Sequence, residues 1–137
     1  MKFKGKILSL LIVASLVVSS MFSVGLAANY SDVDESSSYY QSISLLSALG
    51  LLKGYEDNTF KPDGDITRAE FAAVVVRAKG QEETAQSSQG DTIFEDVPGN
   101  FWGSGYINVA TSLGIINGYG DGKFGPDDKV TYEQAVK

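Results

Sequence analysis

Shifted by 64 positions, the chain matches itself without a gap from residue 32 to residue 70. The identical pairs are Asp32-Val33 with Asp96-Val97, Ile43 with Ile107, Leu49-Gly50 with Leu113-Gly114, Gly54-Tyr55 with Gly118-Tyr119, Asp57 with Asp121, Phe60 with Phe124, Pro62-Asp63 with Pro126-Asp127 and Thr67 with Thr131. An ungapped register that keeps glycines and prolines as well as apolar residues indicates an internal duplication. We therefore expect two copies of one structural unit, residues 28–80 and 93–137, joined by a polar, flexible linker over residues 81–92.

The first segment of each copy has a helical pattern, over residues 37–49 and 102–113. In the second copy the expected buried face, at spacings of four, three and four, is Trp102, Tyr106, Val109 and Leu113. Gly50 and Gly114 follow these helices, where a left-handed C-terminal cap is expected. Short apolar runs and turn residues come next, which predicts a loop before the second helix of each copy.

A second helix begins after the turn in each copy. Thr67 with Glu70, and Thr131 with Gln134, have the spacing of a capping box. In the first copy Gly80 ends the helix, and the expected buried stripe is Phe71, Val74, Val75 and Ala78. In the second copy the chain reaches Lys137 in under two turns, whereas an isolated helix needs roughly 12–15 residues. We therefore expect this sequence to be a fragment of a longer protein.

Residues 1–27 have the features of a secretory signal peptide. Three lysines form a basic start, an apolar run follows over residues 7–18, and Gly25 and Ala27 precede a cleavage site after Ala27. The alternative is a retained membrane anchor, since residues 7–28 approach the roughly 20 residues that span a bilayer. Interspersed serines and the cleavage pattern favour removal, after which we expect no membrane association.

The composition argues against several functional classes. The net charge of −6 becomes more negative when the lysines of the signal peptide are removed, whereas nucleic-acid binding uses clustered Lys and Arg. The chain has no His and no Cys, so Ser-His and Cys-His catalysis, common zinc sites and disulfides are absent. The carboxylates recur with the turns and form no separate pair of the glycosidase type. We expect no enzyme, no cofactor and no metal centre in these residues.

A calcium loop is the alternative explanation of the acidic turns. When Gly64 is placed at the sixth position of an EF-hand loop, Lys61 falls on the third, where an oxygen ligand is required. In the second copy Lys123 falls on the first position. The EF-hand pattern therefore fails in both copies. Another calcium site, built from Asp57, Asp121 or Asp127, is the remaining alternative. It is a minor one, because turn aspartates usually form hydrogen bonds with their own backbone.

The motifs of the two copies also resemble a known family. The second copy reads D-V, W, a helix, G-I-I-N-G-Y-G-D-G-x-F and P-D, and the first copy ends in I-T-R-A-E-F. This order resembles the S-layer homology repeat. The resemblance implies a mainly α fold of tandem helix–loop–helix repeats with short extended segments, forming part of a pseudo-threefold helical module.

The same resemblance implies a location and a partner. It implies a secreted protein at the cell wall or S-layer surface of a bacterium. Such repeats anchor proteins non-covalently to secondary cell-wall polysaccharide, often a polymer that bears pyruvylated sugars. Further repeats beyond Lys137 are the other implied partners.

The resemblance further implies polysaccharide-binding residues, at the Asp of D-V, the Trp that follows and the Arg of T-R-A-E. In this chain they are Asp32, Asp96, Trp102 and Arg68. Ser38 replaces the tryptophan in the first copy, and Tyr132 replaces the arginine in the second. One complete groove is therefore expected, formed by Arg68, Asp96 and Trp102 across the repeat boundary.

Two of these residues have a purely structural alternative. Arg68 gains nothing locally from the helix dipole, and with open backbone N–H groups it would suit a carboxylate; otherwise it is solvated or ion-paired. Trp102 is either a stacking platform for a sugar or a core residue of the helix. If the repeats have lost polymer binding, as T-Y-E-Q indicates, they serve as an assembly module of an extracellular protein.

Overall fold

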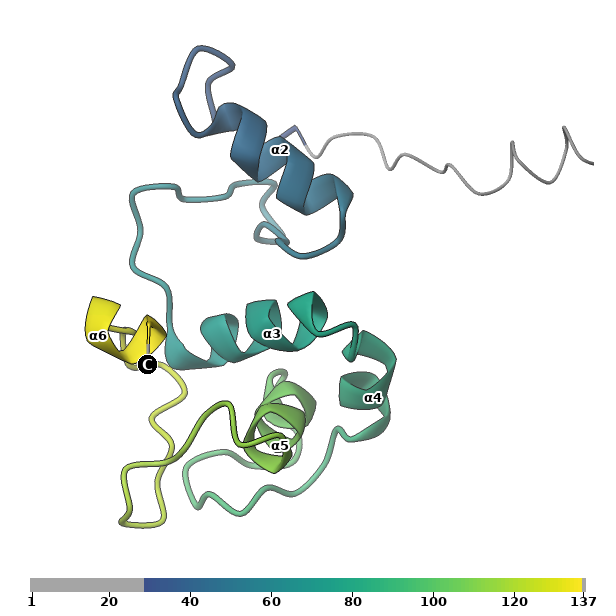
Figure 1. The fold of residues 1–137 in the computed structure, drawn as a ribbon, viewed down its shortest axis with the longest axis vertical. Helices are drawn as coiled ribbons and strands as arrows, with labels where there is room; N and C mark the ends of the chain where they lie inside the picture. Colours follow the sequence, from purple (N-terminus) through teal and green to yellow (C-terminus); the bar gives the residue numbers. More distant parts are fainter. Residues whose placement is uncertain (1–28, 137) are drawn as a thin grey trace, which may run out of the picture.

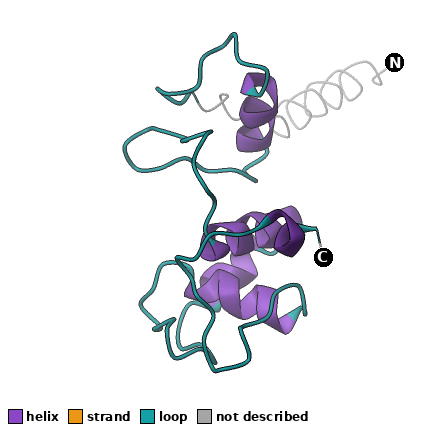
Figure 2. Cartoon of the chain, turned by 90° about the vertical axis from the view of Figure 1, so that its left-hand side faces the viewer, coloured by secondary structure: helices purple, strands orange, loops and turns teal. Residues whose placement is uncertain are grey.

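The structure is a computed structural model that describes residues 29–136, so the expected signal peptide lies outside the described residues (Figure 1). Its helices are α2 (Tyr40–Ala48), α3 (Arg68–Ala78), α4 (Glu82–Ser87), α5 (Ser104–Ser112) and α6 (Tyr132–Ala135). Residues 29–136 contain no strand, only an isolated antiparallel bridge between Thr67 and Lys129 (Figure 2). None of the helices in this range is long and apolar enough to cross a membrane. The predicted mainly α fold is confirmed.

The two copies have the same local structure. Gly50 and Gly114 follow α2 and α5 with φ of 72° and 68°, the left-handed conformation expected of a C-terminal cap. Thr67 and Thr131 accept the predicted capping-box hydrogen bonds at the starts of α3 and α6. α2 and α5 begin later than predicted, at Tyr40 and Ser104, and no side chain caps either helix start.

The helices described over residues 29–136 do not pair within each copy. α3, α4 and α5 pack together around the larger hydrophobic core, which includes Val76, Ile107 and Phe124 (Figure 1). α2 contacts none of the other described helices. Its Ile43 packs instead in a smaller core with Tyr30, Val33 and Phe60. The second helix of the first copy therefore belongs to the core of the second copy.

The buried face of α3 differs from the predicted stripe. It consists of Ala69, Ala72, Ala73 and Val76, whereas the predicted Phe71, Val74, Val75 and Ala78 lie outside it. These small side chains let α3 lie close to α5: a Cβ at Gly103, the residue before α5, would be 3.5 Å from that of Ala69. The prediction was wrong because apolar periodicity favours large residues, while close helix packing selects small ones.

The buried face of α5 was also predicted incorrectly. Ile107, Val109 and Ala110 are buried, whereas Trp102 and Leu113 are 50% and 52% exposed. Of the predicted face only Val109 is fully buried. The structural alternative for Trp102, a core residue of the helix, does not hold.

The segment expected to be a flexible linker contains α4. One apolar residue in its polar sequence, Ala85, is buried in the larger core. A side chain at Gly105 would overlap the carbonyl oxygen of Ala85, so the glycine allows α4 and α5 to touch. The polar composition concealed this contact because it depends on one alanine and one glycine.

Candidate functional site

The aspartate at the start of each copy fixes that copy's turn. Asp96 accepts the backbone N–H groups of Phe124 and Gly125, both at 2.8 Å. Asp32 accepts those of Phe60 and Lys61 at 2.8 and 2.7 Å. Each carboxylate therefore joins the beginning of its copy to a turn 28 or 29 residues later in the chain.

These hydrogen bonds also set the acidity of the two aspartates. Burial raises the pKa of Asp96, but the N–H groups of Phe124 and Gly125 outweigh it and bring the pKa below its usual value. The pKa of Asp32 is lowered by the same balance, with the N–H groups of Phe60 and Lys61. Both side chains are therefore held in the ionised form that accepts these hydrogen bonds.

Arg68 forms the joint between the two copies. Its Nε donates to the carbonyl of Phe124 and its Nη2 to that of Asn117, both at 2.8 Å. The guanidinium also lies over the rings of Tyr119 and Phe124, at 4.6 and 4.5 Å from their centroids. Arg68 and Asp96 thus meet at Phe124, one on its carbonyl and the other on its N–H.

The start of α3 is closed by the second copy. The backbone N–H groups of Arg68 and Ala69 donate to the carbonyls of Asp128 and Pro126 at 2.8 and 3.0 Å. The hypothesis that Arg68 presents open backbone donors to a carboxylate is therefore wrong. Those donors complete the contact between the copies instead.

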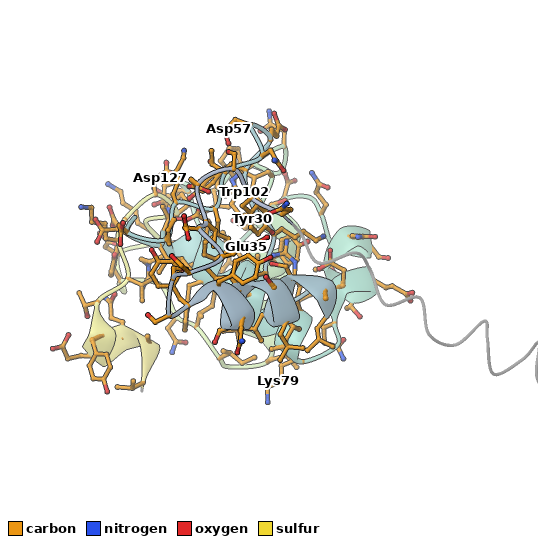
Figure 3. All side chains as sticks on the ribbon, turned by 90° about the horizontal axis from the view of Figure 1, so that it is seen from above. Tyr30, Glu35, Asp57, Lys79, Trp102 and Asp127 are labelled. Carbon is orange, nitrogen blue, oxygen red and sulfur yellow. The ribbon has the colours of Figure 1, made fainter. Side chains whose placement is uncertain are left out.

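Trp102 lies in a different place, in a groove of about 580 Å³ between the loop of residues 52–66 and one side of α3. We call it the Trp102 groove. Its lining includes Lys53, Tyr55, Lys61, Glu70, Arg77 and Trp102, but neither Arg68 nor Asp96. Arg68 and Asp96 therefore share Phe124, whereas Trp102 lines this groove. Figure 3 shows Trp102 toward the middle of the view, with Asp57 and Lys79 at the periphery.

The two sides of the Trp102 groove are tied by side chains. The hydroxyl of Tyr55, from the loop, donates to Glu70 of α3 at 3.0 Å. Lys53, also from the loop, contacts Glu82 of α4 at 2.9 Å. Two aromatic rings of the lining are partly exposed, Tyr55 at 41% and Trp102 at 50%.

Sequence reasoning missed the polar residues of this groove. Arg77 shares the helix face of Glu70 and Ala73, at a spacing of seven and four residues, so helical periodicity could have located it. Lys53 carried no signal, because Asn117 occupies its position in the second copy.

The acidic turns contain no grouping suited to a metal ion among residues 29–136. Asp57 accepts the N–H and hydroxyl of Thr59 at 3.1 and 2.6 Å, and Asp121 accepts the N–H of Lys123 at 3.1 Å. Each of these aspartates forms hydrogen bonds with the residue two positions later in the sequence, as turn aspartates usually do.

Comparisons with known proteins follow the same two copies. The family profile of the S-layer homology domain matches residues 29–72 and 93–136. A "Surface layer protein" of Brevibacillus choshinensis is 43% identical over 70% of this chain and 9% of its own length. A "Cell surface protein" of Thermoanaerobacter kivui is 36% identical over 99% of this chain and 18% of its own.

A third relative carries its role in its name. The "Cellulosome-anchoring protein" of Acetivibrio thermocellus is 35% identical over 58% of this chain and 18% of its own length. The chain thus spans less than a fifth of each of these relatives. No solved structure matches the chain.

Proposed function

The chain belongs to the S-layer homology domain family, and from that premise we propose that it anchors a secreted protein non-covalently to the bacterial cell wall by binding secondary cell-wall polysaccharide. The names of the relatives support a place at the cell surface and an anchoring role. The observation that carries the binding role is the Trp102 groove, with two half-exposed aromatic rings. The proposed activity is binding, with no catalysis by these residues.

Trp102 is the proposed contact with the polymer. Half of its surface is exposed, although a large aromatic side chain gains free energy from burial. A sugar stacked on the ring would cover this surface, and polar groups around it would fix the sugar's orientation. The ring centroids of Phe101 and Tyr106 lie 5.5 and 6.3 Å from that of Trp102.

We propose that three other residues affect polymer binding indirectly, by shaping the fold: Arg68, Asp96 and Asp32. Asp32 holds the turn at Phe60 and Lys61, and both of these residues line the Trp102 groove. Arg68 and Asp96 hold the second copy against α3, which forms one side of the groove. In this proposal these three residues shape the groove, while Trp102 contacts the polymer.

An assembly module without polymer binding is the second candidate function. The observation in its favour is that Arg68 joins the two copies through two hydrogen bonds and contacts with two rings, as expected of a residue retained for packing. In this case the exposed groove would be filled by protein instead of sugar.

Co-sedimentation with cell-wall sacculi distinguishes the two functions. The chain without residues 1–27 is mixed with sacculi that are intact or stripped of secondary polymer. The variants are Trp102→Ala and, as a control, Leu113→Ala, whose side chain is similarly exposed but does not line the groove. Anchoring predicts binding that needs the polymer and Trp102 but not Leu113. A folded chain that stays in the supernatant with both preparations would refute anchoring and favour assembly.

The negative charge of the chain does not preclude an acidic polymer. At physiological ionic strength charges are screened beyond roughly 8 Å, so the groups inside the groove decide the interaction.

A further inference from the structure

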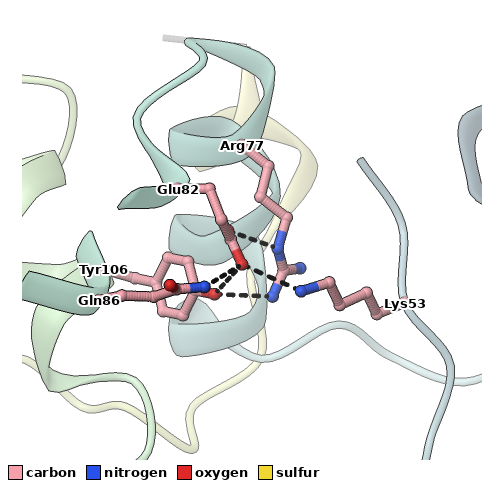
Figure 4. A network of polar contacts seen from close by, with 5 residues as sticks. All are labelled: Lys53, Arg77, Glu82, Gln86 and Tyr106. Atoms are coloured by element: carbon pink, nitrogen blue, oxygen red, sulfur yellow. Dashed lines mark hydrogen bonds and ion pairs between the residues drawn. The ribbon is translucent and has the colours of Figure 1, made fainter. Parts of the chain in front are cut away.

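Glu82, the first residue of α4, collects four polar contacts from three other parts of the chain and from α4 itself (Figure 4). Its Oε1 accepts from Lys53 at 2.9 Å, from the hydroxyl of Tyr106 at 2.8 Å and from Gln86 at 3.3 Å. Its Oε2 accepts from Nε of Arg77 at 3.1 Å. α4 lies outside the two regions that match the family profile, so this residue is not part of the repeat.

The two cations that Glu82 binds line the Trp102 groove, but Glu82 does not. Lys53 comes from the loop, and Arg77 comes from α3 on the opposite side. Because both bind one carboxylate, their charged groups are held side by side at this end of the groove. Glu82 thus lies outside the lining of the groove and holds two cations that belong to the lining.

Tyr106 connects this pair to Trp102. Arg77 donates to the hydroxyl of Tyr106 at 3.2 Å and lies 4.9 Å from its ring centroid. The ring of Tyr106 in turn lies 6.3 Å from that of Trp102. The cation pair and the exposed aromatic surface therefore belong to the same end of the groove.

The cations keep donors available for a ligand. An ammonium has three N–H donors and a guanidinium has five, and the contacts described here use one on Lys53 and two on Arg77. The side chain of Lys53 is 56% exposed and that of Arg77 only 11%, so a ligand would reach mainly the donors of Lys53. Glu82 itself is held by four contacts, three on Oε1 and one on Oε2, and need not move when a ligand binds.

The acidic groups on the other parts of the groove are mostly occupied. Glu70 accepts from Tyr55 and from the N–H of Thr67 in the capping box, and Asp65 pairs with Lys129. Glu56 is the remaining carboxylate of the lining, and it belongs to the loop rather than to α3. Of the three cations in the lining, Lys53 and Arg77 share Glu82, whereas Lys61 lies over the ring of Tyr55, 4.0 Å from its centroid.

We propose that Glu82 is a positioning residue that holds Lys53 and Arg77 as a paired contact for the acidic group of a sugar stacked beside Trp102. This inference rests on the proposed function and names the residues of the same groove that would recognise an acidic sugar. Charge-assisted hydrogen bonds from a fixed Lys–Arg pair suit a carboxylate, and the aromatic ring suits the apolar face of the sugar. Arg68, the residue expected to bind the acidic group, is engaged between the copies.

Trp102 provides the readout, because it is the only tryptophan of the chain. Its fluorescence is followed while the chain is titrated with glucuronate or with glucose. The variants are Glu82→Gln and, as a matched control, Glu83→Gln, which removes the same charge from the neighbouring exposed residue. Lys53→Met, at a largely exposed side chain, provides a second variant whose folding is not at risk.

We expect glucuronate to bind the unchanged chain more tightly than glucose. Glu82→Gln is expected to weaken glucuronate binding roughly 3- to 10-fold, as expected when rotamer-rich side chains must be ordered by the ligand. Glucose binding and the Glu83→Gln control should remain unchanged. Glu82→Gln should add less than this in the Lys53→Met background, because part of its effect acts through Lys53.

Other outcomes would overturn the inference. Equal binding of the two sugars, no binding of either, or equal effects of Glu82→Gln and Glu83→Gln would each do so. Equal losses for both sugars would indicate a purely structural role of Glu82. Binding of sacculi measured in parallel separates the two proposals. Sacculi bound without a glucuronate preference would leave anchoring intact. A Glu82-dependent glucuronate response without sacculi binding would remove anchoring alone.

Discussion

Removal of the Asp96 carboxylate is expected to lower the free energy of unfolding by about 2–4 kcal/mol. Its two oxygens accept two backbone N–H groups at 2.8 Å. Hydrogen bonds to a charged group contribute roughly 1.5–3 kcal/mol each, and partial exposure of Asp96 reduces the total. In Asp96→Ala the N–H of the buried Phe124 also loses its acceptor. For a domain of this size the melting temperature should fall on the order of 10–25 °C.

Urea unfolding, followed by circular dichroism and by the fluorescence of Trp102, measures this loss. Asp96→Asn keeps one acceptor oxygen and should lose about half as much. Asp127→Ala, at an exposed position, is the control for a change in charge. Asp32→Ala should cost less than Asp96→Ala, since Asp32 is the more exposed of the two. A loss below about 1 kcal/mol for Asp96→Ala, or one equal to that of Asp127→Ala, would refute the reasoning.

The pH dependence of the free energy of unfolding is a second test of the same interaction, because the expected direction of the change is known. The pKa of Asp96 is lowered in the folded chain, so its contribution to stability is present above the unfolded pKa of about 3.9 and is lost as the pH falls through the folded pKa. The difference in stability between the unchanged chain and Asp96→Asn should stay constant from about pH 5 to 7 and narrow below about pH 4. A difference that narrows near pH 6 would point to another group.

Five further substitutions test the turn, the caps and the joint between the copies. Gly118→Ala is expected to cost about 2–3 kcal/mol in urea unfolding, because its Cβ would lie 2.5 Å from both the Lys123 carbonyl and the Phe94 ring. Gly114→Ala, in open space at φ 68°, should cost only about 1 kcal/mol, and equal losses would contradict the packing argument. Thr67→Ala should cost about 1 kcal/mol by thermal unfolding; Thr131→Ala should cost less because α6 is exposed and short, and the reverse order would be inconsistent with this account. Arg68→Lys should lower the melting temperature, since lysine lacks the planar fork whose Nε and Nη2 reach the two carbonyls, without lowering co-sedimentation per folded molecule. Lost co-sedimentation at an unchanged melting temperature would make Arg68 a direct contact.

The local structure of the repeat was predictable because it depends on residues close together in the sequence. The glycine caps at Gly50 and Gly114 and the capping box of Thr67 and Glu70 form as their spacing predicts. The resemblance to the S-layer homology repeat is confirmed by the family match over both copies. These features share short-range causes, such as left-handed φ at glycine and hydrogen bonds across three residues.

Helix packing and the site were less predictable because they depend on partners distant in the sequence. The small residues on the buried face of α3 are explained only by the nearby α5. Burial of Ala85 is likewise explained only by its contact with Gly105. Likewise, the sequence motifs predict that Arg68 lines a binding groove with Trp102. The sequence does not reveal that Asn117 and Phe124 supply carbonyls to the Arg68 side chain. The role of Glu82 depends on Lys53 and Tyr106, 29 and 24 residues away.

The docking of α3 on the second copy separates the unit that was duplicated from the unit that folds. The sequence repeats with its first copy ending near Gly80, but α3 is completed by carbonyls of Pro126 and Asp128 and by a core that includes Ile107. A chain released from the ribosome through residue 80 would contain α3 without the surface that stabilises it. Closing contacts between residues this far apart has an entropic cost that local helices avoid, so we expect the second copy to order the end of the first. Protein engineers who shorten or recombine such chains should therefore cut between the turn at residues 60–61 and the start of α3 rather than at the repeat boundary.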